Sequence, residues 1–189
     1  SGGIGSVIEY TGEGISTLSM DQRMTICNMS IEGGARAGLI APDEVTFDYI
    51  RGRPFAPSGE KLEKMIEYWE SFLTTDSETC HDKSVKMDLS RLVPQVSWGT
   101  NPSMVIDVTE NIPYPEVFAD GNVEQEKSAK RALEYMGLEP GVPITEINID
   151  RVFIGSCTNA RLEDLVDASR VLEGRTVSSS VNAMVVPGS

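Results

Sequence analysis

The sequence has little positive charge. Its 16 Lys and Arg residues compare with 29 Asp and Glu residues, so the 189-residue chain carries a net charge of −13. Nucleic acids and anionic membrane surfaces bind clustered cations, and this balance therefore argues against both as partners. An anionic ligand would have to be bound by a local cluster of basic residues or by residues of another chain.

Long apolar runs and paired cysteines are scarce as well. No run approaches the roughly 18 consecutive apolar residues of a membrane span, and no signal peptide is recognisable, which predicts a cytoplasmic or organelle-matrix protein. The cysteines Cys27, Cys80 and Cys157 are odd in number and far apart. They argue against a disulfide framework and favour a reducing compartment.

In other respects the composition is that of an ordinary globular domain. The spacing of apolar residues along the sequence predicts an α/β fold. Helical spacing of apolar residues, with start and stop signals, predicts helices over residues 20–36, 42–50, 58–74, 122–137 and 160–173. Apolar or alternating runs predict strands over residues 6–10, 39–41, 85–89, 94–102, 152–155 and 181–186. Ser19 and Gln22 have the spacing of a capping box at the start of the first helix, and Asn122 and Gln125 have the same spacing at the start of the helix over 122–137. Gly137 is the expected C-cap of that helix.

A linker at residues 139–143 divides this pattern. Its two prolines and one glycine are incompatible with a helix or a central strand, so we expect one domain over residues 1–143 and the start of another over 144–189. The strand–helix–strand order of the second part predicts one βαβ unit of a parallel sheet. The chain opens without an initiator Met and stops after a strand-like run, which suggests a piece of a longer protein.

The segment with the clearest chemistry is 155–159 (GSCTN), between a predicted strand and a predicted helix. Open α/β sheets bind ligands at the carboxyl ends of their strands, and a helix N-terminus favours a thiolate. Cys157 is therefore a candidate metal ligand or nucleophile. Thr158 and Asn159 are expected to cap the helix and to direct polar groups at the ligand. A buried cysteine beside an ordinary helix cap is the alternative.

Asn28 and Glu32 form a second candidate pair. They are four residues apart and would share one face of a helix that is otherwise rich in Met and Ile. The alternative interpretation is that both side chains simply lie on the solvent-exposed face of this helix. Cys27 would point about 100° away from Asn28 on this helix, so we expect it to be a buried structural thiol.

Other polar residues are weaker candidates. Arg51 and Arg53 could clamp a carboxylate, although charges of this kind are also typical of a surface loop. Cys80 and His81 could form a nucleophile pair. Adjacent residues of an extended loop point apart, which argues against it.

Several stretches of the sequence resemble the aconitase superfamily. Residues 149–165 (IDRVFIGSCTNARLEDL) resemble its first cysteine signature, and residues 18–32 (LSMDQRMTICNMSIE) resemble its M-x-T-I-C-N-M helix. Residues 41–57 (APDEVTFDYIRGRPFAP) and 94–102 (PQVSWGTNP) are more similar to the large subunits of 3-isopropylmalate dehydratases than to aconitase proper.

This resemblance implies a fold, an activity and a site. The fold is a three-layer aconitase-like α/β/α domain followed by the first βαβ unit of a cluster-binding domain. The activity is that of a hydro-lyase of leucine biosynthesis, which isomerises 2-isopropylmalate and 3-isopropylmalate once the full-length large subunit is joined by its small subunit. Cys157 is implied as one of three cysteine ligands of a [4Fe–4S] cluster with Asn159 beside it, and Glu32 and Asn28 are implied as catalytic residues.

One departure limits these expectations. The family's other two cluster cysteines lie in a Cys-x-x-Cys motif, whereas the three cysteines here are 53 and 77 positions apart. One thiolate cannot hold a cubane cluster. We therefore expect this chain to be the middle third of the large subunit, inactive and without a cluster on its own. The arginines that bind the dicarboxylate substrate are expected from the small subunit.

Other functions stay open at this point. Within the superfamily, the chain could belong to a homoaconitase or a methylmalate-type hydro-lyase. Outside it, a cluster-free binding or regulatory module is the main alternative. A hydrolase with Cys157 as nucleophile would need a histidine within reach, and His81 is the only one in the sequence.

Overall fold

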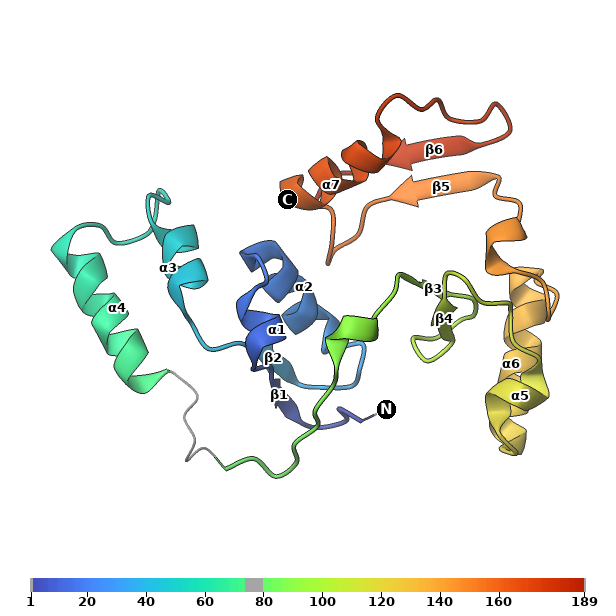
Figure 1. Ribbon diagram of the computed structural model, residues 1–189, viewed down its shortest axis with the longest axis horizontal. Helices are drawn as coiled ribbons and strands as arrows, with labels where there is room; N and C mark the ends of the chain where they lie inside the picture. Colours follow the sequence, from blue (N-terminus) through green and yellow to red (C-terminus); the bar gives the residue numbers. More distant parts are fainter. Residues whose placement is uncertain (1, 74–79, 189) are drawn as a thin grey trace. The chain divides into compact units, whose positions relative to one another are not determined.

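The computed structural model describes residues 2–73 and 80–188, and its mixture of helices and short strands confirms the predicted α/β class (Figure 1). The described residues form three two-stranded sheets, β1–β2, β3–β4 and β5–β6. The chain divides into two compact units, residues 1–87, 153–178 and 183–189 in the first and 88–152 and 179–182 in the second. The boundary expected after residue 143 concerns the domains of a longer protein and stays a prediction. Residue 74, the last residue of the helix predicted over 58–74, lies outside the described residues.

The first unit begins with two parallel strands, β1 (Val7–Glu9) and β2 (Ala37–Leu39). Parallel strands need a crossover connection, which here contains the helices α1 (Glu13–Ser16) and α2 (Met20–Met29). Figure 1 shows α2 beside this pair of strands. A Cβ added to Gly38 would lie 2.9 Å from the Cα of Cys27, so a glycine is needed where β2 packs on α2. The strand predicted at 39–41 lies two residues earlier, at Ala37–Leu39.

Helix α2 starts where the sequence predicts and ends earlier. The Ser19 hydroxyl accepts the Gln22 N–H and the Gln22 side chain accepts the Ser19 N–H, which completes the predicted capping box. The prediction of a helix to residue 36 is wrong, because α2 ends at Met29 and turns follow. The adjacent Gly33 and Gly34 disfavour a helix that continues to residue 36. Gly34 adopts φ +89°, a left-handed conformation that ends helices.

Helices α3 (Glu44–Ile50) and α4 (Glu60–Phe72) share a small apolar cluster, close to the predicted ranges. Phe47 is fully buried there, and its ring stacks on Trp69 with centroids 6.1 Å apart. The other buried members of the cluster are Leu62 and Ile66. One apolar stripe of α4 therefore faces α3, as its amphipathic pattern predicts.

An ion pair joins α2 to the start of α3. Arg23 is only 3% exposed, and its Nη1 and Nη2 lie 2.6 and 2.7 Å from the two carboxylate oxygens of Asp43. Arg23 also donates to the carbonyl oxygens of Ser16 and Leu18. Asp43 in turn accepts two backbone N–H groups in the first turn of α3 as its N-cap. The hydrogen bond from Arg23 is the main reason why the pKa of Asp43 is lowered.

Residues 85–89 do not form the strand that their alternation predicts. The chain is irregular up to Asp88, and the 3-10 helix η1 (Leu89–Arg91) follows. Val85 and Met87 are 74% and 71% exposed, so within the described residues nothing covers the apolar face. The prediction is wrong because alternation favours a strand only where another strand pairs with it and one face is buried.

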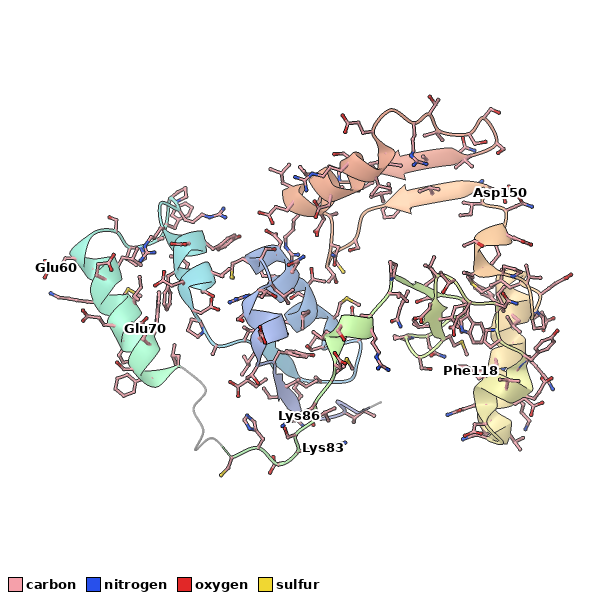
Figure 2. The ribbon with its side chains drawn as sticks, viewed as in Figure 1. Glu60, Glu70, Lys83, Lys86, Phe118 and Asp150 are labelled. Atoms are coloured by element: carbon pink, nitrogen blue, oxygen red, sulfur yellow. The ribbon has the colours of Figure 1, made fainter. Side chains whose placement is uncertain are left out.

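The second unit consists of a hairpin and two helices. Strands β3 (Gln95–Ser97) and β4 (Val105–Asp107) are antiparallel, and α5 (Pro115–Ala119) and α6 (Val123–Met136) follow. The buried core contains Trp98, Met104, Ile112, Ala129, Ala132 and Leu133. Phe118, labelled in Figure 2, packs edge-on against the Trp98 ring at 5.1 Å.

Helix α6 has the two ends that the sequence predicts. The Asn122 side chain accepts the N–H groups of residues 124 and 125, and Gly137 closes the helix in the left-handed conformation. The capping box expected with Gln125 does not form, because the Asn122 N–H donates to the Ala119 carbonyl instead. Beyond α6, the predicted linker leads into the 3-10 helix η2 (Ile144–Glu146).

The last elements form the predicted βαβ unit from β5 (Arg151–Ile154), α7 (Leu162–Leu172) and β6 (Asn182–Val185). Asn182 N–H donates to the carbonyl of Asp150, and Val186 N–H donates to that of Ile154. The residue numbers of the bonded partners increase in the same direction along β5 and β6, so the two strands are parallel. Among the helices that the structure describes, none is long and apolar enough to cross a membrane.

Candidate active site

One pocket is lined by two segments that are far apart in the sequence, residues 27–38 and 157–158. Its volume is about 580 Å³. The residues that line it are Cys27, Asn28, Ile31, Glu32, Arg36, Ala37, Gly38, Cys157 and Thr158. All of them belong to the first compact unit. Three predicted site residues, Asn28, Glu32 and Cys157, therefore share one pocket, and the fourth, Asn159, does not line it.

The end of α2 supplies the amide and the carboxylate of the pocket. Asn28 lies in the last turn of the helix, whereas Glu32 lies in the turns after it, so the expectation that both are helical is wrong. Ser30 holds these turns, because its hydroxyl donates to the Ile26 carbonyl and bonds the Tyr10 hydroxyl at 2.8 Å. Among the described residues, the Asn28 and Glu32 side chains have no hydrogen-bond or ion-pair partner, so both are available to a ligand.

The loop after β5 supplies the thiol. The Ser156 hydroxyl accepts the N–H groups of Thr158 and Asn159 at 3.2 and 2.6 Å and donates to the Asn159 carbonyl. This closed turn leaves Cys157 exposed, with its Sγ 3.8 Å from the Thr158 hydroxyl. The local sequence thus presents a thiol and a hydroxyl together at the carboxyl end of a parallel strand.

The start of α7 differs from its prediction. The helix begins at Leu162, and the Asp164 carboxylate accepts the N–H groups of Ala160 and Arg161 at 3.1 and 3.0 Å. The expectation that Thr158 and Asn159 cap this helix is therefore wrong. The Asn159 amide nitrogen lies 3.5 Å from Asp164 Oδ1, away from the pocket lining. A cofactor role for Asn159 stays a prediction.

Arg161 links the two elements that build the pocket. Its Nη1 donates to the Asp21 carbonyl at 3.4 Å and to the Thr25 hydroxyl at 3.3 Å, and its Nε lies 3.5 Å from Asp21 Oδ1. Asp21 and Thr25 belong to α2, which also carries Asn28. The charge of Asp21 and its hydrogen bond to Glu163 raise the pKa of Glu163. Arg161 thus pairs with the carboxylate of Asp21, which also interacts with Glu163.

Cys27 differs from its expected position. It is half-buried and lines the pocket together with Asn28, because the wall of the pocket includes more than one face of the last turn of α2. Burial raises the pKa of the Cys27 thiol. The protonated form is therefore favoured, which makes it a poorer nucleophile and metal ligand than an ordinary thiol.

The weaker candidates lie elsewhere. Arg51 pairs with Asp48 at 2.6 Å on the surface of α3, and the Arg53 guanidinium stacks on the Tyr49 ring at 4.0 Å. Both contacts are those of ordinary surface residues. His81 Nε2 lies 2.9 Å from a carboxylate oxygen of Glu9. Cys157 lines the pocket, whereas His81 and Glu9 do not.

A second hollow runs along α4. It has a volume of about 540 Å³ and is lined by Glu60, Lys61, Lys64, Met65, Tyr68 and Trp69. All six residues belong to α4, and no thiol or group from another element joins them within the part of the chain that the structure describes. The pocket at Cys157 is therefore the better candidate site.

A thiol, an amide and an acid line this pocket at the carboxyl end of a parallel strand, which is where open α/β sheets bind ligands. The family comparison identifies the class of protein. The model of the aconitase family (aconitate hydratase) matches residues 1–189, and the chain belongs to this family. Membership assigns it to the hydro-lyase superfamily, whose members generally use a [4Fe–4S] cluster.

The described residues do not fit a complete cluster site. Cys157 is the one exposed thiol in the pocket, and Cys27 beside it is disfavoured as a thiolate. No group of three His, Cys, Asp or Glu side chains in the described part of the chain is arranged to hold a metal ion. Cubane clusters are held by several thiolates. These residues therefore provide at most one favourable ligand.

Three residues at or behind the pocket escaped the sequence analysis: Arg36, Arg161 and Asp21. Arg36 lines the pocket, and the other two hold its walls together. Arg36 could have been identified from the sequence, because it is the one basic residue between the pair Gly33 and Gly34 and strand β2. The pairing of Arg161 with Asp21 had none, because 140 positions separate them.

Proposed function

We propose that this chain is part of the large subunit of a hydro-lyase that interconverts 2-isopropylmalate and 3-isopropylmalate in leucine biosynthesis. Membership of the aconitase family supports the hydro-lyase class. The narrower proposal is supported by the similarity of residues 41–57 and 94–102 to 3-isopropylmalate dehydratase large subunits. The partner would be the separate small subunit, in a heterodimer of the cytoplasm or an organelle matrix.

The observation that carries the proposal is the convergence of Asn28, Glu32 and Cys157 on one pocket. Removing water from a hydroxy acid requires a group that withdraws the hydroxyl and a group that takes a proton from the neighbouring carbon. Glu32 has a carboxylate without a protein partner among the described residues, which suits proton exchange or the binding of a hydroxyl. Asn28 can orient the same ligand by hydrogen bonds.

In this proposal Cys157 is a cluster ligand and Asn159 lies close to the cluster. The remaining cysteine ligands would come from outside this chain, because it contains no Cys-x-x-Cys motif. Residues 1–143 would be the second domain of the subunit and residues 144–189 the start of the cluster-binding third domain. The 189-residue chain alone would then be inactive.

The test uses the full-length large subunit assembled with its small subunit under anaerobic conditions. Activity is measured on 2-isopropylmalate, homocitrate-type and methylmalate-type substrates. Glu32→Gln should lower kcat about 10²- to 10⁴-fold, the range of general acid–base catalysis. Cys157→Ser should abolish activity and the cluster absorbance, whereas Cys80→Ser, a control at an exposed cysteine outside the pocket, should keep both.

Each alternative has its own outcome. Preference for a homocitrate-type or methylmalate-type substrate would replace the proposed reaction by another of the same superfamily. A Cys157→Ser enzyme that keeps cluster and activity would refute the assigned role of the thiol. A wild-type assembly without activity on any of these substrates would favour a binding or regulatory module.

A further inference from the structure

Arg36 is the basic residue of the pocket. It is exposed in the pocket wall, and among the described residues no Asp or Glu oxygen lies within 4.0 Å of its guanidinium. Four other arginines of the first unit, Arg23, Arg51, Arg161 and Arg170, each pair with a carboxylate. Arg53 and Arg175 have no such pair among the described residues, but they do not line the pocket. A chain with 29 acidic residues offers many such partners, so an unpaired arginine inside a pocket points to a ligand.

The backbone of Arg36 is held although its side chain is free. Its N–H donates to the Ser6 carbonyl at 2.7 Å, just before β1. The next residue, Ala37, pairs with Val7 as the first residue of β2, and Gly38 packs against Cys27 of α2. The position from which the guanidinium extends is therefore determined by the sheet and by the helix that carries Asn28. A ligand meets a positioned cation rather than a residue of a free loop.

The charges in the pocket define the chemical class of the ligand. Arg36 and Glu32 both line it without forming an ion pair with each other. A planar guanidinium binds a carboxylate through two parallel hydrogen bonds. An acid such as Glu32 and an amide such as Asn28 bind a hydroxyl. A molecule with a carboxylate and a hydroxyl on neighbouring carbons satisfies all three side chains.

We propose that Arg36 binds one carboxylate of the hydroxy-acid substrate and so contributes to substrate affinity. This inference rests on the proposed function, and it adds an arginine of this chain to the arginines expected from the small subunit. Arg36 is a binding residue here and takes no proton. Its loss affects KM and ligand affinity more than kcat.

The test compares Arg36→Gln, Arg36→Lys and Arg175→Gln in the assembled full-length enzyme. Arg175 is exposed beyond α7, does not line the pocket, and has no ion pair within the described residues, so its variant controls for the loss of one charge. KM and kcat are measured with 2-isopropylmalate. The dissociation constant of 2-isopropylsuccinate, which keeps both carboxylates and lacks the reacting hydroxyl, is measured by calorimetry.

Arg36→Gln should raise both KM and the dissociation constant about 10- to 140-fold, the contribution of hydrogen bonds to a charged group. Arg36→Lys should raise them less, because it keeps the charge and loses the two-pronged geometry. Arg175→Gln should leave both within twofold. Because Arg36 has no protein partner to lose, thermal unfolding of its variants should match the wild type.

The outcomes separate the two proposals. An active wild type whose affinities are unchanged in Arg36→Gln would overturn the assignment of Arg36 and leave the proposed function standing. Equal losses in Arg36→Gln and Arg175→Gln would also overturn it, since a general charge effect would explain both. A wild type that binds 2-isopropylsuccinate through Arg36 but has no activity would overturn the proposed reaction alone. Absence of both binding and activity would overturn both proposals.

Discussion

Replacing Asp43 by asparagine tests the buried ion pair that joins α2 to α3. Asparagine keeps the N-cap of α3 but removes the charge that faces Arg23. Arg23 is buried and would retain two neutral carbonyl acceptors, from Ser16 and Leu18. Breaking a fully buried pair from one side costs about 3–5 kcal/mol. The Asp43 side chain is 41% exposed, so solvent screening lowers the expected loss to about 2–3 kcal/mol.

A second substitution separates the charge from the cap. Asp43→Ala removes both, and losing the cap should add about 1 kcal/mol. Asp48→Asn is the matched control, because it breaks an exposed pair with Arg51 on the same helix and should change stability little. The measurement is urea unfolding of each variant, followed by far-UV circular dichroism. The reasoning is refuted if Asp43→Asn and Asp48→Asn unfold at the same urea concentration.

The same pair predicts a dependence on pH. Because the folded-state pKa of Asp43 is lowered, its contribution is complete above the ordinary aspartate pKa of about 4 and is lost as the pH falls through the folded-state value. The wild type should therefore exceed Asp43→Asn in stability at pH 7, and the difference should shrink in acid. A difference that stays constant down to pH 2 would contradict the ion pair as its source.

Three further results are expected. Gly38→Ala should destabilise the fold by about 1–3 kcal/mol, because the new Cβ would lie 2.9 Å from the Cα of Cys27, and a urea midpoint equal to the wild type would contradict this contact. Iodoacetamide should modify Cys157 before Cys27, since burial raises the pKa of the Cys27 thiol. Mass spectrometry of the alkylated peptides measures the order, and modification of Cys27 first would contradict this explanation. Glu163→Gln should raise the melting temperature at pH 7, because Asp21 raises the pKa of Glu163 and the two charges repel once ionised. The gain should vanish in acid, where Glu163 is protonated, and a gain that persists there would refute the explanation.

The sequence alone predicted features that depend on a few neighbouring residues. The capping box of Ser19, the N-cap Asn122 and the terminal Gly137 all appear in the structure, because each satisfies backbone groups within three or four residues. The α/β class and the βαβ unit followed from periodicity in the same way. The segment around Cys157 was recognisable because its residues are consecutive.

Tertiary structure decided what depends on distant partners. The alternation at residues 85–89 predicts a strand, yet Val85 and Met87 stay exposed because no described strand pairs with them. The meeting of Glu32 with Cys157 in one pocket depends on the packing of α2 against β2 and on the contact of Arg161 with α2. Local propensity carries no information about contacts across more than a hundred residues, so only the folded chain shows that Cys27 and Arg36 line the same pocket as the predicted site residues.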